Sequence, residues 1–158
     1  DDDMVLPTED PSRDSGDVHG SSQFESTYEG VDSACTWVER TVGVDGVPKG
    51  HDIHMLMFAV RETLLNAVEH GNRRAGGRFI DVAVSVQGGA LSVDVSDAGS
   101  GFDLETVLRN IDDMPDSSRV GKRGLHVMRS FTDDIEIHGG TVTLTFRERK
   151  EGFDESLR

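Results

Sequence analysis

Apolar residues recur at two different spacings along the chain, and these spacings separate predicted helices from predicted strands. Across residues 51–72 they return at every third or fourth position, which is the period of an amphipathic helix. The apolar stripe is wide, so we expect this helix to be covered on several sides. It consists of Ile53, Leu56, Met57, Val60, Leu64, Ala67 and Val68. Residues 31–43 show the same period and predict a shorter helix, which a glycine-rich break ends.

Strict alternation of apolar and polar residues predicts the strands. Two hairpins are expected, each with a pair of glycines at its turn. They join residues 80–86 to 91–95 around Gly88-Gly89, and 135–137 to 142–146 around Gly139-Gly140. Residues 24–28 alternate as well and predict a strand ahead of the first helix. Residues 104–111 and 125–131 return to the helical period and predict two more helices.

The order of these elements indicates the fold class. One strand and two helices come first, followed by a hairpin, a loop with a short helix, another helix and the second hairpin. Consecutive hairpins favour an antiparallel or mixed sheet with the helices gathered on one face. We therefore predict an α+β fold, a two-layer sandwich whose mixed, mostly antiparallel sheet is covered on one face by helices. A doubly wound parallel sheet does not fit this order.

Composition divides the 158 residues into one domain with two tails. The first 21 residues are strongly acidic and contain few large apolar groups, so they cannot bury enough surface to offset the entropy lost on ordering. We expect a flexible acidic tail over 1–21, a folded domain over 22–149 and a short frayed tail over 150–158.

The net charge and the cysteine content limit which partners and which cellular compartment we expect. The formal net charge of -14 argues against nucleic acid as a partner, because phosphate binding needs a surplus of Lys and Arg. The same negative charge is expected of a protein that binds basic protein surfaces. It is equally expected of a protein whose acidic surface is only solvated and has no partner. No apolar run could span a membrane and no signal peptide is visible, so we expect a cytoplasmic setting. Cys35, the single cysteine, is expected to be a small buried thiol.

Polar residues interrupt the apolar pattern of the long helix. Glu62, Asn66 and His70 are spaced four apart, so their side chains share one helix face. A carboxylate and an amide one turn apart offer the oxygen ligands that Mg²⁺ prefers, usually together with phosphates and water. An exposed face of ordinary polar residues would show the same spacing. His51 and His54 are only loosely spaced for a metal, and we expect them to be surface or core residues.

A glycine-rich turn follows the strand that ends at Asp97. In the segment Asp97-Ala98-Gly99-Ser100-Gly101, the glycines let the backbone approach a ligand closely or adopt positive φ. A carboxylate at the end of a strand can accept a hydrogen bond from an exocyclic amine such as that of adenine. An ordinary acidic turn has the same composition. A calcium loop is disfavoured because the later EF-hand ligands are missing.

A basic segment precedes the helix predicted over residues 125–131. It consists of Gly121, Lys122, Arg123 and Gly124. Backbone N–H groups at the start of a helix attract anions, and the Lys and Arg side chains add positive charge. The segment is not a Walker P-loop, since the GxxxxGK[ST] pattern is absent. A solvated glycine-rich loop would have the same composition.

Taken in order, these motifs resemble a known superfamily. The helix motif ExxxNAxxHG, the strand-end motif DxGxGF, the motif GxRGLxxMR and Gly140-Thr141 in a hairpin are similar to those of the Bergerat-fold ATPases. That superfamily includes DNA gyrase, histidine kinases and MutL. The chain most resembles its anti-sigma factor serine-kinase branch, over about residues 22–148.

The resemblance implies roles for the best-defined positions. Glu62 would be the base, or the carboxylate that orients a water, near the γ-phosphate of ATP. Asn66 would hold Mg²⁺ against the phosphates. Asp97 would bind the adenine amine, with help from Thr141.

The resemblance also places other residues around the nucleotide. Gly99 and Gly101 would form a turn beside it, residues 103–120 would form a lid, and Gly121, Lys122, Arg123 and Gly124 would receive the phosphates. Lys122 stands where such proteins often have a glycine, and Arg119 lies near the position of a lid arginine. His70 matches a position beside the site without an assigned role.

The same resemblance implies an activity and partners. The chain would be an ATP- and Mg²⁺-dependent serine/threonine protein kinase of the anti-sigma type. It would phosphorylate a small antagonist (anti-anti-sigma) protein, sequester a sigma factor and pair as a homodimer. Two alternatives stay open: a nucleotide-gated protein-binding module with little transfer activity, and the ATPase domain of a larger multidomain regulator. An intact Glu62 favours the enzyme.

Overall fold

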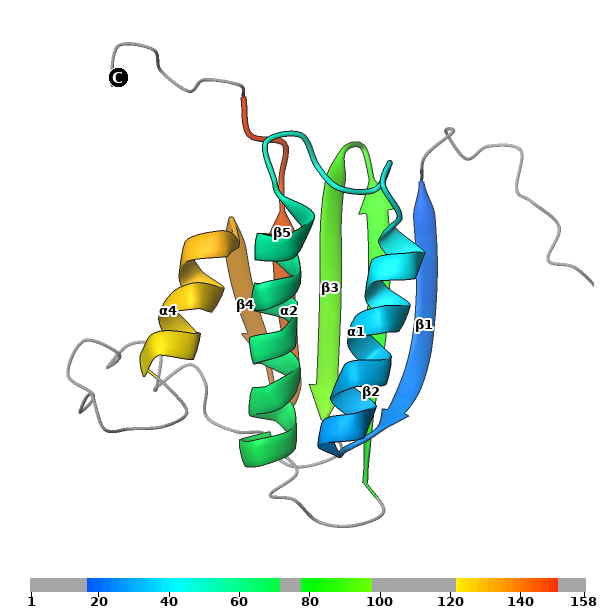
Figure 1. The fold of residues 1–158 in the computed structure, drawn as a ribbon, viewed down its shortest axis with the longest axis vertical. Coiled ribbons are helices and arrows are strands. Elements are labelled where there is room, and N and C mark those ends of the chain that lie inside the picture. The colour runs from blue at the N-terminus through cyan, green and yellow to red at the C-terminus, as the bar shows by residue number, and fades with distance from the viewer. Residues whose placement is uncertain (1–16, 72–77, 98–121, 151–158) are drawn as a thin grey trace, which may run out of the picture.

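A computed structural model describes residues 17–71, 78–97 and 122–150 of the chain. Within them, five strands form one sheet in the order β1-β2-β3-β5-β4, and every pairing is antiparallel. The strands are β1 (Val18–Glu25), β2 (Phe79–Gln87), β3 (Ala90–Asp97), β4 (Asp134–His138) and β5 (Thr141–Phe146). The helices α1 (Tyr28–Val42), α2 (Ile53–Asn66) and α4 (Lys122–Phe131) lie on one face of this sheet (Figure 1). The predicted two-layer α+β sandwich is confirmed.

A glycine turn and the alternation of side chains set the register of the sheet. Gly88 and Gly89 have φ of 59° and 79° and form the turn between β2 and β3, a conformation that other residues rarely adopt. Beyond the turn, Val84 lies opposite Val93, which in turn lies opposite Leu144 of β5. All three side chains are buried, so this register turns the apolar residues of three strands toward the helices.

One hydrophobic core fills the space between the sheet and the helices. It contains most of the apolar stripe predicted for the long helix. Its largest fully buried side chains are Phe146, Leu56, Leu64, Ile80, Leu91, Met128, Leu144, Val31 and Val38. Cys35 is buried among them, and burial raises the pKa of its thiol. A protonated buried thiol is a packing group rather than a nucleophile.

The long helix changes its geometry directly after Asn66. It begins at an N-terminal cap, where the Asp52 carboxylate accepts a hydrogen bond from the His54 N–H at 2.8 Å. It continues as α2 to Asn66 and then becomes a π-helical turn, Ala67–Gly71. Such turns are rare and often occur at functional sites. The helix predicted over 51–72 is therefore present, with this change of helical type inside it.

The first strand begins earlier than the sequence suggested. Residues 18–21 were expected in the acidic tail, but β1 starts at Val18 and pairs with β2 along its whole length. A Cβ at Gly20 would meet Thr41 and Trp37 at 3.4 Å, an ordinary contact distance, so β1 lies directly against α1 at this point. The helix predicted over 104–111 lies outside the described residues. No helix in the described part of the chain is long and apolar enough to cross a membrane.

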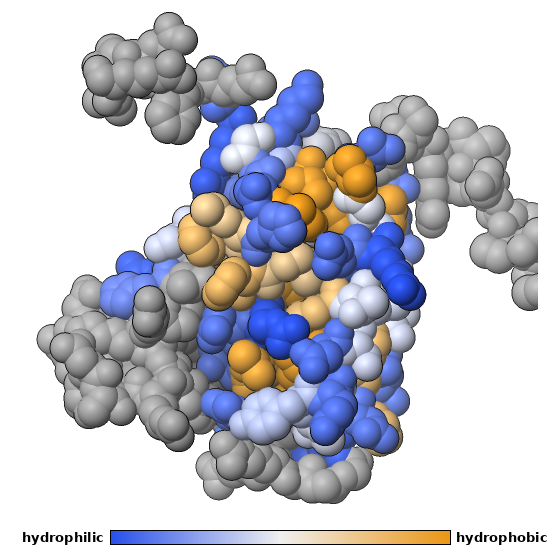
Figure 2. Space-filling model, viewed as in Figure 1, coloured by the Kyte–Doolittle hydropathy of each residue, from blue (hydrophilic) through white to orange (hydrophobic). Residues whose placement is uncertain are grey.

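The outer side of the helical layer is mainly hydrophilic, with apolar residues exposed over α2 (Figure 2). Two of these are large, Met55 at 52% and Phe58 at 58% exposure. The α2 helix is thus buried along one side and carries an exposed apolar group near its N-terminal end, rather than being covered on several sides as the wide stripe predicted.

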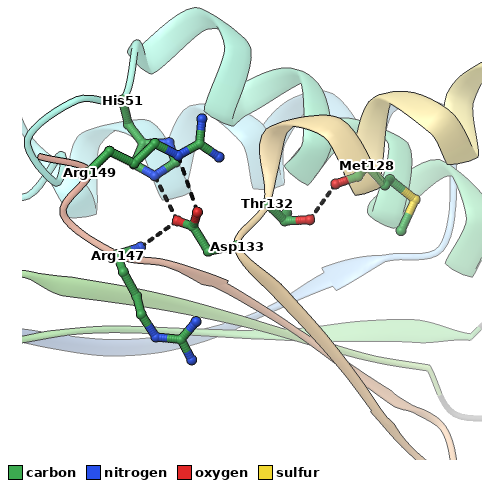
Figure 3. Close-up of polar contacts among 6 residues, drawn as sticks. All are labelled: His51, Met128, Thr132, Asp133, Arg147 and Arg149. Carbon is green, nitrogen blue, oxygen red and sulfur yellow. Dashed lines mark hydrogen bonds and ion pairs between the residues drawn. The ribbon is translucent and has the colours of Figure 1, made fainter. Parts of the chain in front are cut away.

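A polar cluster fixes the end of α4 (Figure 3). The carboxylate of Asp133 lies 2.8 Å from the ring nitrogen Nε2 of His51 and accepts hydrogen bonds from Arg149 Nε at 3.1 Å and from the Arg147 N–H at 2.7 Å. The His51 ring is buried and meets the Phe146 ring edge-on. Burial alone would raise the pKa of Asp133, but these hydrogen bonds lower it on balance. One carboxylate therefore joins the loop before α2, the turn after α4 and the end of β5.

Candidate functional site

A pocket opens where the C-terminal end of α2 faces the end of β3 and the β4–β5 turn. It is lined by Thr63, Asn66, Ala67, Val95, Asp97, Gly139, Gly140 and Val142. The empty space is about 330 Å³, counting the part that is open to solvent. The structure thus brings Asn66 and Asp97 together, although the two were predicted from separate motifs.

Asn66 is buried, yet half of its side-chain amide has no partner among the described residues. Its exposed fraction is 4%, and its Nδ2 donates a hydrogen bond to the Met128 sulfur Sδ in α4 at 3.4 Å. The carbonyl oxygen Oδ1 has no hydrogen bond to any described residue. A buried polar atom without a partner costs free energy, so in native proteins such an atom commonly meets an ordered water or an ion, or belongs to a functional site. The oxygen is therefore suited to a cation or a donor group in the pocket.

Asp97 forms the opposite wall of the pocket. Its backbone N–H donates to the Gly140 carbonyl oxygen at 3.0 Å, which ties the end of β3 to the β4–β5 turn. Asp97 lies opposite the core residue Ile80, so its side chain is on the helical side of the sheet. A carboxylate held there can accept a hydrogen bond from an amine that enters the pocket.

Glu62 lies one helical turn before Asn66, half-buried and outside the lining of the pocket. Burial raises the pKa of Glu62, the nearby charge of Glu69 raises it further, and Arg61 opposes the change. Arg61 is itself held by the Asp32 carboxylate at 2.8 Å. A carboxylate with a raised pKa is better suited to take a proton near neutral pH.

Thr141 lies away from the pocket, contrary to the role that the resemblance implied. Its hydroxyl is 2.7 Å from the Ser96 hydroxyl, on the polar face of the sheet that the helices leave open. Side chains alternate along a strand, so the next residue, Val142, faces the pocket instead. The Thr141 hydroxyl is therefore not placed to help Asp97 bind adenine, as the resemblance had implied. In this register the hairpin reaches the pocket through Gly139, Gly140 and Val142.

The basic segment is part of a helix rather than a loop ahead of one. The α4 helix begins at Lys122, so Lys122, Arg123 and Gly124 lie in its first turn. The first turn of a helix still presents N–H groups without helical partners, so an anion can bind there. The remaining predicted positions lie outside the described residues: Gly99, Gly101, Arg119 and Gly121, the lid over 103–120, and the side chains of His70, Lys122 and Arg123.

The two histidines near the start of α2 lie in different surroundings. His51 belongs to the Asp133 cluster, and His54 is exposed on α2. Among the described residues, no group of three or more His, Cys, Asp or Glu side chains could hold a metal ion. A Mg²⁺ ion bound mainly by phosphates and water needs only one or two protein oxygens, so this finding is compatible with the role expected for Asn66.

Sequence reasoning missed several residues of the site. Thr63 lines the pocket, and its buried hydroxyl donates to the Ala59 carbonyl at 2.9 Å. Its position as a polar residue within an apolar stripe was an available signal. Gly139 and Gly140 were predicted as a turn, and Gly140 also as part of a motif, but neither was predicted to line the pocket. Met128 was predicted only as an apolar position of the helix over 125–131, and nothing in the sequence points to its contact with Asn66.

Comparison with known proteins is consistent with this geometry. Residues 24–147 match the histidine kinase-like ATPase domain family. The chain belongs to this family. It is also similar to the serine-protein kinase RsbW of Listeria monocytogenes serotype 4a and of Listeria innocua serovar 6a. Each match is 31% identical over 114 residues, which cover 67% of this chain and 73% of the relative. The resemblance to Bergerat-fold ATPases and to their serine-kinase branch is confirmed.

The pocket of this histidine kinase-like ATPase domain fits the nucleotide that its family implies. The carbonyl oxygen of Asn66, which has no hydrogen bond to a described residue, is of the hard oxygen type that Mg²⁺ prefers. The Asp97 carboxylate offers an acceptor to an amine at the other wall. Gly139 and Gly140 leave the wall between them without bulky side chains, so a flat base can approach the backbone.

Proposed function

We propose that this chain is an ATP- and Mg²⁺-dependent serine/threonine protein kinase of the anti-sigma type. The proposal depends above all on the meeting of Asn66 and Asp97 in one pocket, with the Asn66 oxygen buried and free of described partners. The relatives that are named serine-protein kinases support transfer to a hydroxyl group. The acceptor would be a small antagonist protein. A sigma factor would be a second partner, which the kinase sequesters, and two copies of the chain would pair.

Each described residue of the site has a defined task in this proposal. Asp97 accepts a hydrogen bond from the adenine amine, and Asn66 offers its oxygen to Mg²⁺. Asn66 would hold the ion there, and the chemistry that Mg²⁺ would supply is neutralisation of the phosphate charge. The first turn of α4, with Lys122 and Arg123, receives the phosphates.

Glu62 is the proposed base for the transfer step. The acceptor hydroxyl oxygen forms a bond to the γ-phosphorus, and the bond from that phosphorus to the bridging oxygen breaks, so ADP leaves. The hydroxyl proton passes to the Glu62 carboxylate. The raised pKa of Glu62 increases its affinity for that proton at the pH of the cell.

Radiolabel transfer from γ-labelled ATP, followed by mapping of the phosphorylated residue, tests this function. Glu62→Ala should leave ATP binding nearly unchanged and slow the transfer by about 10²–10⁴-fold. Glu39→Ala, an exposed glutamate on α1, serves as the control and should transfer at the normal rate. Transfer at the normal rate by Glu62→Ala would exclude Glu62 as the base. A partner that binds tightly with ATP but gains no phosphate would favour the nucleotide-gated binding module.

A further inference from the structure

We propose that Met128 is a positioning residue, which holds the Asn66 amide so that its carbonyl oxygen points into the pocket. The inference rests on the proposed function of Asn66 as the Mg²⁺ ligand. The Asn66 Nδ2 donates to the Met128 sulfur at 3.4 Å, and both side chains are buried, at 4% and 0% exposure. Met128 does not line the pocket, whereas Asn66 does. The nitrogen end of the amide therefore points away from the pocket, toward α4.

The chemistry of a thioether makes this orientation selective. The two ends of an asparagine amide have nearly the same shape, but the oxygen only accepts hydrogen bonds and the NH₂ group only donates. The methionine sulfur is a weak acceptor and cannot donate, so it pairs with the nitrogen end alone. A reversed amide would place its oxygen against the sulfur and turn two N–H groups toward the cation. A leucine of similar size would remove this preference without emptying the site.

The structure also fixes the place of Met128 itself. The Met128 carbonyl oxygen accepts a hydrogen bond from the Thr132 hydroxyl at the end of α4 (Figure 3). The next residue, Asp133, is bound by His51 and Arg149 from two other segments. The α4 helix is thus tied down one turn beyond the sulfur, and it cannot slide along α2 without breaking these contacts. Asn66, the proposed metal ligand, is in this way connected through Met128 and α4 to the hydrogen-bonded cluster around Asp133.

The test compares Met128→Leu with Met57→Leu, a half-buried methionine of α2 outside the pocket. Calorimetry measures the dissociation constant of ATP with Mg²⁺ and with a chelator. We expect Met128→Leu to raise the constant about two- to tenfold with Mg²⁺, the effect of one modest hydrogen bond, and to leave it unchanged with the chelator. Met57→Leu should match the wild type in both conditions. In the wild type, NMR should show an Overhauser contact between the Asn66 side-chain amide protons and the Met128 methyl group.

Three results would overturn the positioning role. One is the absence of that Overhauser contact in the wild type, which needs no variant to fold. Another is Met128→Leu binding Mg²⁺ and ATP as tightly as Met57→Leu. The third is an equal loss of affinity with Mg²⁺ and with the chelator, because this would indicate a packing defect alone. If the wild type binds no ATP at all, the proposed function fails, and the Overhauser contact still decides whether the sulfur holds the amide.

Discussion

Replacing Asp97 with asparagine removes the charge of the proposed adenine acceptor and exchanges one of its two acceptor oxygens for an NH₂ donor, while hardly changing the shape of the pocket. The backbone bond from Asp97 to Gly140, at 3.0 Å, does not involve the side chain, so the end of β3 should stay in place. The loss is that of a hydrogen bond to a charged group in a half-buried position. Such bonds contribute about 1.5–3 kcal/mol. We therefore expect the dissociation constant of ATP to rise about 10- to 150-fold.

Asp94→Asn is the matched control for this experiment. Asp94 lies on the same strand but faces the open side of the sheet, where it accepts a hydrogen bond from the Thr143 hydroxyl at 2.6 Å. Calorimetry with ATP and Mg²⁺ measures both variants, and thermal unfolding verifies that both are folded. Asp94→Asn should bind ATP as the wild type does. Unchanged affinity in Asp97→Asn, or an equal loss in both variants, would refute the adenine assignment.

Two further predictions concern the stability of the described fold. Asp133→Asn should destabilise the protein most at neutral pH. Because the folded-state pKa of Asp133 is lowered, its carboxylate stabilises the fold at pH values above the ordinary pKa of aspartate. This stabilisation is lost as the pH falls through the folded-state pKa, below about 4. A difference in unfolding free energy between variant and wild type that stays constant down to that pH would contradict the role of the charge. Gly50→Ala should cost more than the ~1–2 kcal/mol of a left-handed backbone alone, because Gly50 has φ of 86° and a Cβ there would stand 2.6 Å from the Cβ of Arg149. Gly88→Ala, with φ of 59° and open space around it, is the control for the backbone cost, and equal urea midpoints for the two variants would disprove the steric part.

The sheet and the main helices could be predicted because their patterns are local and mutually consistent. Alternation over 80–86 and 91–95, joined by two glycines, leaves one register that buries every valine on the same side. Asn66 and Asp97 were predictable as partners because one stands near the end of a helix and the other at the end of a strand, in motifs that the resemblance connects. Both residues lie near the ends of secondary-structure elements, and such ends are well marked in a sequence.

Features that depend on packing between elements could not be predicted in the same way. The direction of the Thr141 hydroxyl changes with a shift of one residue in the strand, and the family motif alone does not fix that register. The contact between Met128 and Asn66 exists only because α4 packs against α2. The start of β1 at Val18 depends on pairing with β2, which overrides a polar local sequence.

The most direct test of the central claim is ATP binding to the wild type and to Asn66→Ala, each measured with Mg²⁺ and with a chelator. The free buried oxygen of Asn66 predicts that chelation weakens ATP binding to the wild type. Asn66→Ala should bind with Mg²⁺ about as weakly as the chelated wild type, and the chelator should change its affinity little. A wild type that ignores the chelator would contradict the claim that this pocket binds ATP through Mg²⁺ on Asn66, and so would an Asn66→Ala variant that keeps the full response to Mg²⁺.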